Sequence, residues 1–192
     1  MKGNVKIMAE IWIIAYDGFE ETELIAPADL LMRAGNKVHI LSAAGKTAIT
    51  GTHGITLGAK PYETVKGLPL PDCVMLPGGL PNAHLLRDDP EVIALVQKAY
   101  KAGKIIGAIC AAPCVLERAG LLKGRRATAF PGALVDQSEC EYTGGAAETD
   151  GTVVTGKGMG AAMEFGLALI TRLNGAETAG KVASASMYPH AL

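Results

Sequence analysis

Apolar runs alternate with segments of helical periodicity along most of the chain. Four largely apolar runs predict buried strands, and the most uniform of them, EIWIIAY, is typical of a central strand in a parallel sheet. Strands that alternate with helices through short loops predict an α/β fold, a doubly wound sheet with right-handed crossovers. The predicted strands cover residues 10–16, 37–43, 73–76 and 104–109.

The helix boundaries carry their own signals. Asp89 and Pro90 supply an N-cap and a favoured first residue for one helix. Gly35 ends an earlier helix, because glycine readily adopts the left-handed conformation that follows a helix. Pro27 removes a hydrogen bond inside that helix, which predicts a kink and leaves Glu23 in its less regular first turn.

The remaining segments give shorter patterns. Residues 46–60 predict a hairpin or flap at an edge of the sheet. Alternating residues around 126–130 and 152–155 predict further strands, whereas residues 131–150 are polar and rich in turn formers. The last two helices are expected from about Gly160 to Leu173 and over residues 176–185.

Composition bounds the class of protein. The 192 residues are 49% hydrophobic and carry a net charge of -1, which fits one globular domain over residues 1–192. The near-zero charge and the lack of a Lys/Arg-rich run argue against a specific nucleic-acid or membrane-surface partner. Apolar runs fall short of the ~20 residues of a membrane span, and residues 1–4 lack a signal-peptide core. A cytoplasmic protein is expected.

No motif indicates a metal or a cofactor. The cysteines show neither CxxC nor Cys/His spacing, so a zinc site is not expected, and a reducing compartment keeps them as thiols. The glycine-rich segment 156–160 lacks both the Walker lysine spacing and the dinucleotide spacing, which favours a packing turn. The four cysteines are Cys73, Cys110, Cys114 and Cys140.

Three loops with unusual residues follow predicted strands: the acidic turn 17–23, Pro-Gly-Gly at 77–79, and the turn at Cys110. Ligands of doubly wound sheets collect beyond the carboxyl ends of the strands, so these loops could form one pocket. A helix that opens at Pro113 would direct its free N–H groups at Cys110 and lower the thiol pKa from about 8.5. The N–H groups of Gly79 and Ala111 could then hold an oxyanion.

Each feature also has a purely structural explanation. A cysteine at a strand end is often a small core residue, glutamates at a helix start favour the dipole, and Pro-Gly-Gly can be only a turn. Their occurrence together favours a shared site. The structural explanation is preferred for Cys73 and Cys114, and Cys140 is expected to be exposed and oxidisable. It is also preferred for the four histidines, His39, His53, His84 and His190.

Five motifs extend over nearly the whole chain: GFEETE, VMLPGG, GAICAAP, AFPG and TGKGMGAAMEFGLALI. Together they resemble the ThiJ/PfpI superfamily, and more closely its DJ-one branch, the Parkinson-disease-associated deglycase family with YajL-like bacterial members. The resemblance implies a flavodoxin-like, mostly parallel sheet flanked by helices, a nucleophile elbow at Cys110 and a homodimer. It also implies that Glu23 is a protonated carboxyl bonded to the cysteine, with Gly79 and Ala111 as the facing amides.

The same resemblance suggests pocket residues and departures from the pattern. Gly78 and Met159 are pocket candidates. Phe130 stands where some members carry a histidine near the cysteine, and His53 stands where arginine is common, close to the dimer interface. Ala111 replaces the histidine of PfpI-type proteases, which argues against a peptidase.

The function that the resemblance implies is cofactor-free processing of 2-oxoaldehydes, such as methylglyoxal to lactate, or of glycated side chains. Cys110 would form a hemithioacetal and Glu23 would act as acid and base. Without an imidazole at Phe130, turnover is expected to be slow, because a general base is worth about two to four powers of ten. The alternative is an oxidative-stress sensor and chaperone that works through a Cys110 sulfinate.

Overall fold

A seven-stranded sheet forms the centre of the computed structural model, which describes residues 8–189; His190 and the first four residues lie outside this range. The strand order is β10-β11-β7-β6-β1-β2-β5, and every neighbouring pair is parallel except β10 and β11. The predicted doubly wound, mostly parallel sheet is therefore confirmed. The strands are β1 (Glu10–Ala15), β2 (Lys37–Ser42), β5 (Lys60–Pro61), β6 (Cys73–Leu76), β7 (Ile105–Ile109), β10 (Ala147–Asp150) and β11 (Val153–Gly156).

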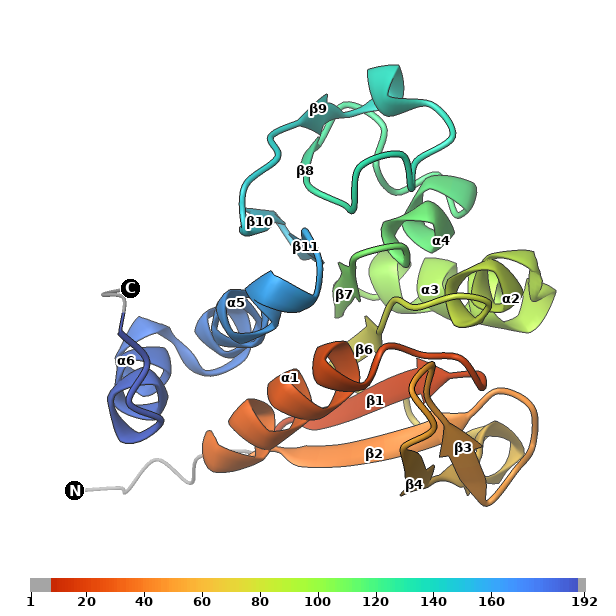
Figure 1. Cartoon of the computed structure of the whole chain (residues 1–192), viewed down its shortest axis with the longest axis horizontal. Helices are drawn as coiled ribbons and strands as arrows, with labels where there is room; N and C mark the ends of the chain where they lie inside the picture. Colours follow the sequence, from red (N-terminus) through yellow and green to blue (C-terminus); the bar gives the residue numbers. More distant parts are fainter. Residues whose placement is uncertain (1–7, 190–192) are drawn as a thin grey trace.

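Helices cover both faces of this sheet (Figure 1). Ile11 and Ile13 of β1 pack toward α1, α5 and α6, whereas Trp12 and Ile14 pack toward α2, α3 and α4. This division follows from the strand geometry, in which successive side chains point to opposite faces. One face carries α1 (Glu21–Arg33), α5 (Ala162–Asn174) and α6 (Ala176–Ala185), and the other carries α2 (Asn82–Asp88), α3 (Pro90–Lys101) and α4 (Pro113–Arg118).

The helix starts follow the expected capping chemistry. The Asp89 carboxylate accepts hydrogen bonds from the N–H groups of Glu91 and Val92, and Pro90 is the first residue of α3. At the start of α1, the Glu20 carboxylate accepts the N–H of Glu23 at 2.7 Å. This cap places Glu23 in the first turn of α1, as expected, after the loop that follows β1.

Two expectations near the sheet edge are wrong. The expected strand at 126–130 is only β8 (Arg126–Ala127), which pairs with β9 (Glu141–Tyr142) outside the main sheet. The expected turn-rich segment 131–150 ends in β10, which pairs antiparallel to β11. The hydrophobic pattern did not predict β10, because this edge strand keeps one side toward solvent and contains polar residues.

The flap was predicted correctly, and the smaller elements complete the fold. Residues 46–60 contain an antiparallel hairpin formed by β3 (Ala48–Thr50) and β4 (Thr56–Gly58). Within residues 8–189, no helix is long and apolar enough to cross a membrane. The single-turn helices are η1 (Tyr62–Val65), η2 (Gln137–Glu139) and η3 (Met159–Ala161).

Candidate active site

Cys110 occupies the sharp turn between β7 and α4. Its φ of 64° lies in the left-handed region, which is uncommon for a residue with a side chain and is found where the surroundings hold the backbone firmly. The Cys110 N–H donates to the Gly156 carbonyl at 2.9 Å, and the Cys110 carbonyl accepts the N–H of Phe130 at 2.8 Å. The turn is therefore fixed from two sides, with the thiol only partly buried.

Glu23 reaches the same turn from α1. Its side chain is fully buried, and Oε2 accepts the N–H of Gly78 at 3.0 Å. A Cβ atom at residue 78 would lie 2.4 Å from Glu23 Oε2 and 2.7 Å from Cys110 Cβ. Only glycine therefore lets the loop after β6 approach the carboxyl and the thiol together.

Gly79 brings the third loop into contact. Its φ is +85°, and a Cβ there would lie 2.4 Å from the Glu20 nitrogen and 2.6 Å from the Gly18 oxygen. The backbone N–H groups of Gly79 and Ala111 both interact with the Cys110 thiol. The loops after β1, β6 and β7 thus converge, because these three strands are neighbours in the sheet and their carboxyl ends share one edge.

Burial dominates the electrostatics of the pair. It raises the pKa of Glu23 to about 7, helped by the negative charge of Glu20 and opposed by interactions with the Cys110 thiol and the Gly78 N–H. Burial, followed by the charge and hydrogen bonding of Glu23, raises the pKa of Cys110 to about 12, although the N–H groups of Ala111 and Gly79 lower it.

The expected lowering of the thiol pKa is therefore wrong, because burial of the thiol and, after it, the charge of Glu23 both raise that pKa. The helix that follows Cys110 has only six residues, and its dipole and free amides do not offset these two effects. Glu23 Oε1 meets no partner with ordinary hydrogen-bond geometry among the described residues, so the carboxyl acts on the thiol mainly through its charge. The two groups titrate as a coupled pair.

A cavity of about 800 Å³ opens onto this pair. Phe130 and Met159, two of the expected pocket residues, line it, and each is 55% exposed. Lys157, Gly144 and Ala146 also line the cavity, although no local pattern in the sequence predicts them at this site. The lining residues are Glu20, Glu23, Cys110, Phe130, Pro131, Gly144, Ala146, Lys157, Gly158, Met159, Gly160 and Ala161.

The glycine-rich segment before α5 has two roles. Gly156 is a packing position, as expected, since a Cβ there would lie 2.9 Å from Ile109 Cγ1. Gly158 instead borders the site, because a Cβ there would lie 3.7 Å from Phe130 Cδ2 and 3.9 Å from Cys110 Sγ. The position of Gly158 beside the site depends on Phe130 and Cys110, which are distant in the sequence, so no local spacing identifies it.

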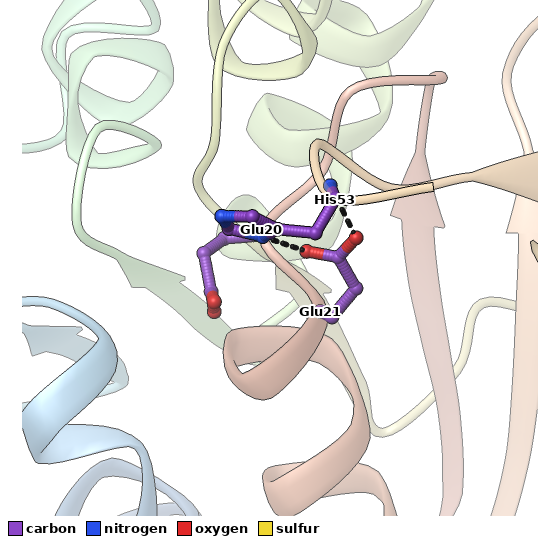
Figure 2. A group of neighbouring side chains, drawn as sticks. All are labelled: Glu20, Glu21 and His53. Carbon is purple, nitrogen blue, oxygen red and sulfur yellow. Dashed lines mark hydrogen bonds and ion pairs between the residues drawn. The ribbon is translucent and has the colours of Figure 1, made fainter. Parts of the chain in front are cut away.

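His53 does not line the cavity of its own chain and instead binds Glu21 (Figure 2). Its Nδ1 lies 2.9 Å from Glu21 Oε2, and its backbone N–H donates to Glu21 Oε1 at 2.6 Å. Burial would raise the pKa of Glu21, but these bonds bring it to about 2, and the carboxylate in turn raises the pKa of His53. Glu20, Glu21 and His53 hold donor atoms within 4.8 Å of one another, the only such group in residues 8–189, but the Glu21 oxygens are already engaged.

The other cysteines are separate from the site. Burial raises the pKa of Cys73, which lies in β6, and raises that of Cys114 to about 11. The Cys114 Sγ lies 3.8 Å from the Ala83 carbonyl and is nearly fully buried, as its assignment to the core predicted. Cys140 is partly exposed.

Known proteins are similar to this chain in sequence. A Parkinson disease protein 7 homolog of Danio rerio is 32% identical over 175 residues, which cover 88% of this chain and 92% of that protein. Protein DJ-1 homolog B of Arabidopsis thaliana is 32% identical over 93% of this chain, which spans only 41% of that protein. A protein named a deglycase from Pyrococcus abyssi is 33% identical over 64% of this chain and 72% of that protein.

Solved structures agree with the sequence comparison. The crystal structure of Drosophila melanogaster DJ-1beta superimposes with a TM-score of 0.89 at 30% identity, over 96% of this chain and 100% of that one. Its likeness extends through the sheet and both helical layers, since so little of either chain is left out. Residues 9–172 match the model of the DJ-1/PfpI family, and the chain therefore belongs to this family.

Proposed function

We propose that the protein processes 2-oxoaldehydes without a cofactor, with Cys110 as nucleophile and Glu23 as acid and base. One observation carries the proposal: a buried carboxyl with a pKa of about 7 lies beside a thiol that opens into a large cavity. A carboxyl that titrates near neutral pH can both give and take a proton under working conditions. The relative from Pyrococcus abyssi that is named a deglycase supports the same class of chemistry.

The reactive form holds one proton between Cys110 and Glu23. The pair loses its first proton near pH 7, and the proton that remains resides on the carboxyl or on the sulfur. When it resides on Glu23, the carboxyl no longer repels the thiolate, and the N–H groups of Gly79 and Ala111 stabilise the sulfur. This thiolate is the nucleophile of the proposed reaction.

The reaction then balances without an external oxidant. The thiolate adds to the aldehyde carbon, a C–S bond forms, and the carbonyl oxygen takes the proton of Glu23. The Glu23 carboxylate next removes the proton from that carbon, and the hydroxyl proton moves to the oxygen of the neighbouring carbon. Glu23 then protonates the neighbouring carbon, which gives a thioester of the 2-hydroxy acid and leaves Glu23 ionised. Water cleaves the C–S bond, so methylglyoxal and water yield lactate and regenerate the thiol. One carbon is oxidised and its neighbour is reduced.

A second candidate function uses the same sulfur in oxidative-stress sensing with chaperone activity. Peroxide would oxidise the Cys110 thiolate to a sulfenate and then to a sulfinate, each step reducing one peroxide to water or alcohol. The position of Cys114 favours the sulfinate over a disulfide, because its Sγ is buried against the Ala83 carbonyl and is not a resolving thiol. Protonated Glu23 would hydrogen-bond the oxidised sulfur.

The decisive experiment measures D- and L-lactate formed from methylglyoxal by the wild-type protein and by Cys110→Ser. The wild-type protein is expected to form one enantiomer in excess and Cys110→Ser to form none above the buffer rate. Cys140→Ser is the matched control, because Cys140 lies outside the cavity, and it should keep wild-type turnover. If the wild-type protein and Cys110→Ser form equal amounts of lactate, the proposed enzymatic function is wrong. If peroxide oxidises Cys110 to a sulfinate and no turnover is measured, the proposed sensor function is favoured.

We also propose that the protein is a homodimer. His53 lies in the flap, is largely exposed and does not line its own cavity, so it could act on a substrate only at a second copy. Light scattering coupled to size exclusion tests this: a dimer mass is expected, and a monomer mass at micromolar concentration contradicts it.

A further inference from the structure

We infer that the Cys110 cavity selects carbonyl compounds that carry a bulky apolar substituent, above all an aromatic ring. The inference rests on the proposed role of Cys110 as nucleophile. The inference specifies which class of substrate fits the side chains that line the cavity. Three features of the cavity support it: its size, its lining and the position of Phe130.

The cavity is much larger than the reacting group. Its volume is about 800 Å³, within the roughly 300–1,000 Å³ that hold drug-sized ligands. Methylglyoxal has five heavy atoms and would leave most of this space to water. A substrate with a ring attached to the ketone carbon would fill more of the cavity while its aldehyde carbon stays at the sulfur.

Apolar side chains form the wall beside the sulfur. Phe130 and Met159 are large and half exposed, and Pro131 continues the same wall. Two half-exposed large apolar side chains in one cavity are more typical of a binding surface than single ones scattered over a protein. Covering them with an apolar substituent removes their surface from water, which is favourable in proportion to the area covered.

A backbone hydrogen bond fixes the position of Phe130 relative to Cys110. A Cβ placed on Gly158 would lie 3.7 Å from Phe130 Cδ2 and 3.9 Å from Cys110 Sγ. The phenyl ring and the sulfur therefore both lie next to the backbone of Gly158. The Phe130 N–H donates to the Cys110 carbonyl at 2.8 Å, which ties the ring to the turn that carries the thiol. A substituent on a carbon bonded to the sulfur would therefore meet the face or edge of this ring.

The charges in the cavity do not favour an anionic substrate instead. Lys157 is exposed at the rim, but Glu20 and Glu23 line the same cavity. In the reactive form the Cys110–Glu23 pair carries one negative charge and the Glu20 carboxylate another, so one ammonium group gives an anionic substituent no net attraction. A neutral apolar substituent is therefore the better fit.

The test uses a pair of reagents with the same reacting group and does not depend on turnover. Bromoacetone and 2-bromoacetophenone both alkylate a thiolate, which displaces bromide and forms a C–S bond. Intact-mass spectrometry follows their second-order rates at Cys110 in a Cys140→Ser background. Each rate is divided by the rate of the same reagent with N-acetylcysteine, which removes intrinsic reactivity.

The wild-type protein should favour the aryl reagent at least tenfold after this correction. Phe130→Ala should reduce the preference to about threefold or less, Met159→Ala should reduce it partly, and Phe130→Leu should retain part of it through its apolar volume. Leu68→Ala is the matched control, since Leu68 is also 55% exposed but lies outside this cavity. Circular dichroism checks that each variant is folded.

The outcomes separate this inference from the proposed function. A corrected ratio near one in the wild-type protein, or a ratio that neither Phe130→Ala nor Met159→Ala changes, overturns the inference. The lactate assay is run beside it, with phenylglyoxal to mandelate as the aryl counterpart. If the protein prefers the aryl reagent but shows no turnover, the proposed enzymatic function is refuted and the inferred selectivity of the cavity is retained. If it shows turnover but no preference for the aryl reagent, only the inferred selectivity is refuted.

Discussion

The backbone N–H of Gly78 donates a 3.0 Å hydrogen bond to Oε2 of Glu23, and this bond joins the end of β6 to the first turn of α1. It satisfies one oxygen of a fully buried carboxyl and leaves the other without an ordinary partner. Such a buried carboxyl keeps its proton to higher pH than an exposed one. The chemistry of the site therefore depends on a contact between segments that are far apart in the sequence.

Gly78→Ala should disrupt both stability and the site. Its Cβ would overlap Glu23 Oε2, Cys110 Cβ and the Ile109 carbonyl, all within 2.9 Å, and overpacking of this kind costs about 1–3 kcal/mol. Thermal unfolding should shift down by several degrees, and Cys110 alkylation should lose its wild-type pH dependence. Gly180→Ala is the control, because its Cβ meets nothing within 4 Å inside α6, and it should be neutral or stabilising by about 0.5–1 kcal/mol. Equal melting temperatures for Gly78→Ala and the wild type would contradict the steric argument.

Glu23→Gln should change the pH at which Cys110 becomes reactive. In the wild-type protein, alkylation should rise with a midpoint near pH 7, where the coupled pair loses its first proton. In the glutamine variant that ionisation is gone, and burial still raises the pKa of the thiol above its ordinary value of 9.0, so the midpoint should move to higher pH. Iodoacetamide kinetics in a Cys140→Ser background measure both midpoints. A wild-type protein whose reactivity rises only above pH 9 would show that the remaining proton stays on the sulfur.

Glu20→Gln should lower the pH midpoint of Cys110 alkylation. The Glu20 carboxylate raises the pKa of Glu23 by charge repulsion, so its neutralisation should let the pair lose its proton at lower pH. Glutamine keeps a side-chain oxygen that can accept the Glu23 N–H, and the cap of α1 is retained. Glu91→Gln, in the first turn of α3, should leave the midpoint unchanged. An unchanged or higher midpoint in Glu20→Gln would exclude Glu20 as a source of the raised pKa.

His53→Gln should weaken the protein most between about pH 4.5 and 6.5. The pKa of Glu21 is lowered from 4.5 to about 2, so its ionised form stabilises above pH 4.5 and this contribution is lost as pH falls toward 2. The pKa of His53 is raised above 6.5, so its contribution is complete below pH 6.5 and is lost as pH rises through the raised value.

The size of that effect should be small. The His53 side chain is 76% exposed, so water and salt screen its interaction with Glu21 and the contribution to the free energy of unfolding is small. Urea unfolding at pH 4, 5.5 and 8 measures the difference between wild type and variant, with His84→Gln in α2 as the control. A difference that is largest at pH 8 would contradict the assigned direction of the His53 shift.

Local patterns predicted most of the framework. The apolar runs gave the buried parallel strands, and Asp89 with Pro90 gave the start of α3, because periodicity and capping depend on residues a few positions apart. The position of Cys110 at a strand end and the opening of α4 at Pro113 were read from the sequence for the same reason. The strand predicted at 126–130 is shorter than its pattern, and β10 was missed, because pairing with a partner strand decides where such strands begin and end.

The sequence by itself determined where strands and helices alternate along the chain and placed three loops with candidate site residues at strand ends, and the strand order of the sheet made those loops neighbours. Only the tertiary structure decided that Glu23 is fully buried, that the thiol pKa is raised with Glu23 ionised, and that Phe130 forms a cavity wall. The physical reason is that a pKa depends on desolvation and on charges in space. Those surroundings come from α1, β6, β7 and the segment before α5, whose contacts no local pattern encodes.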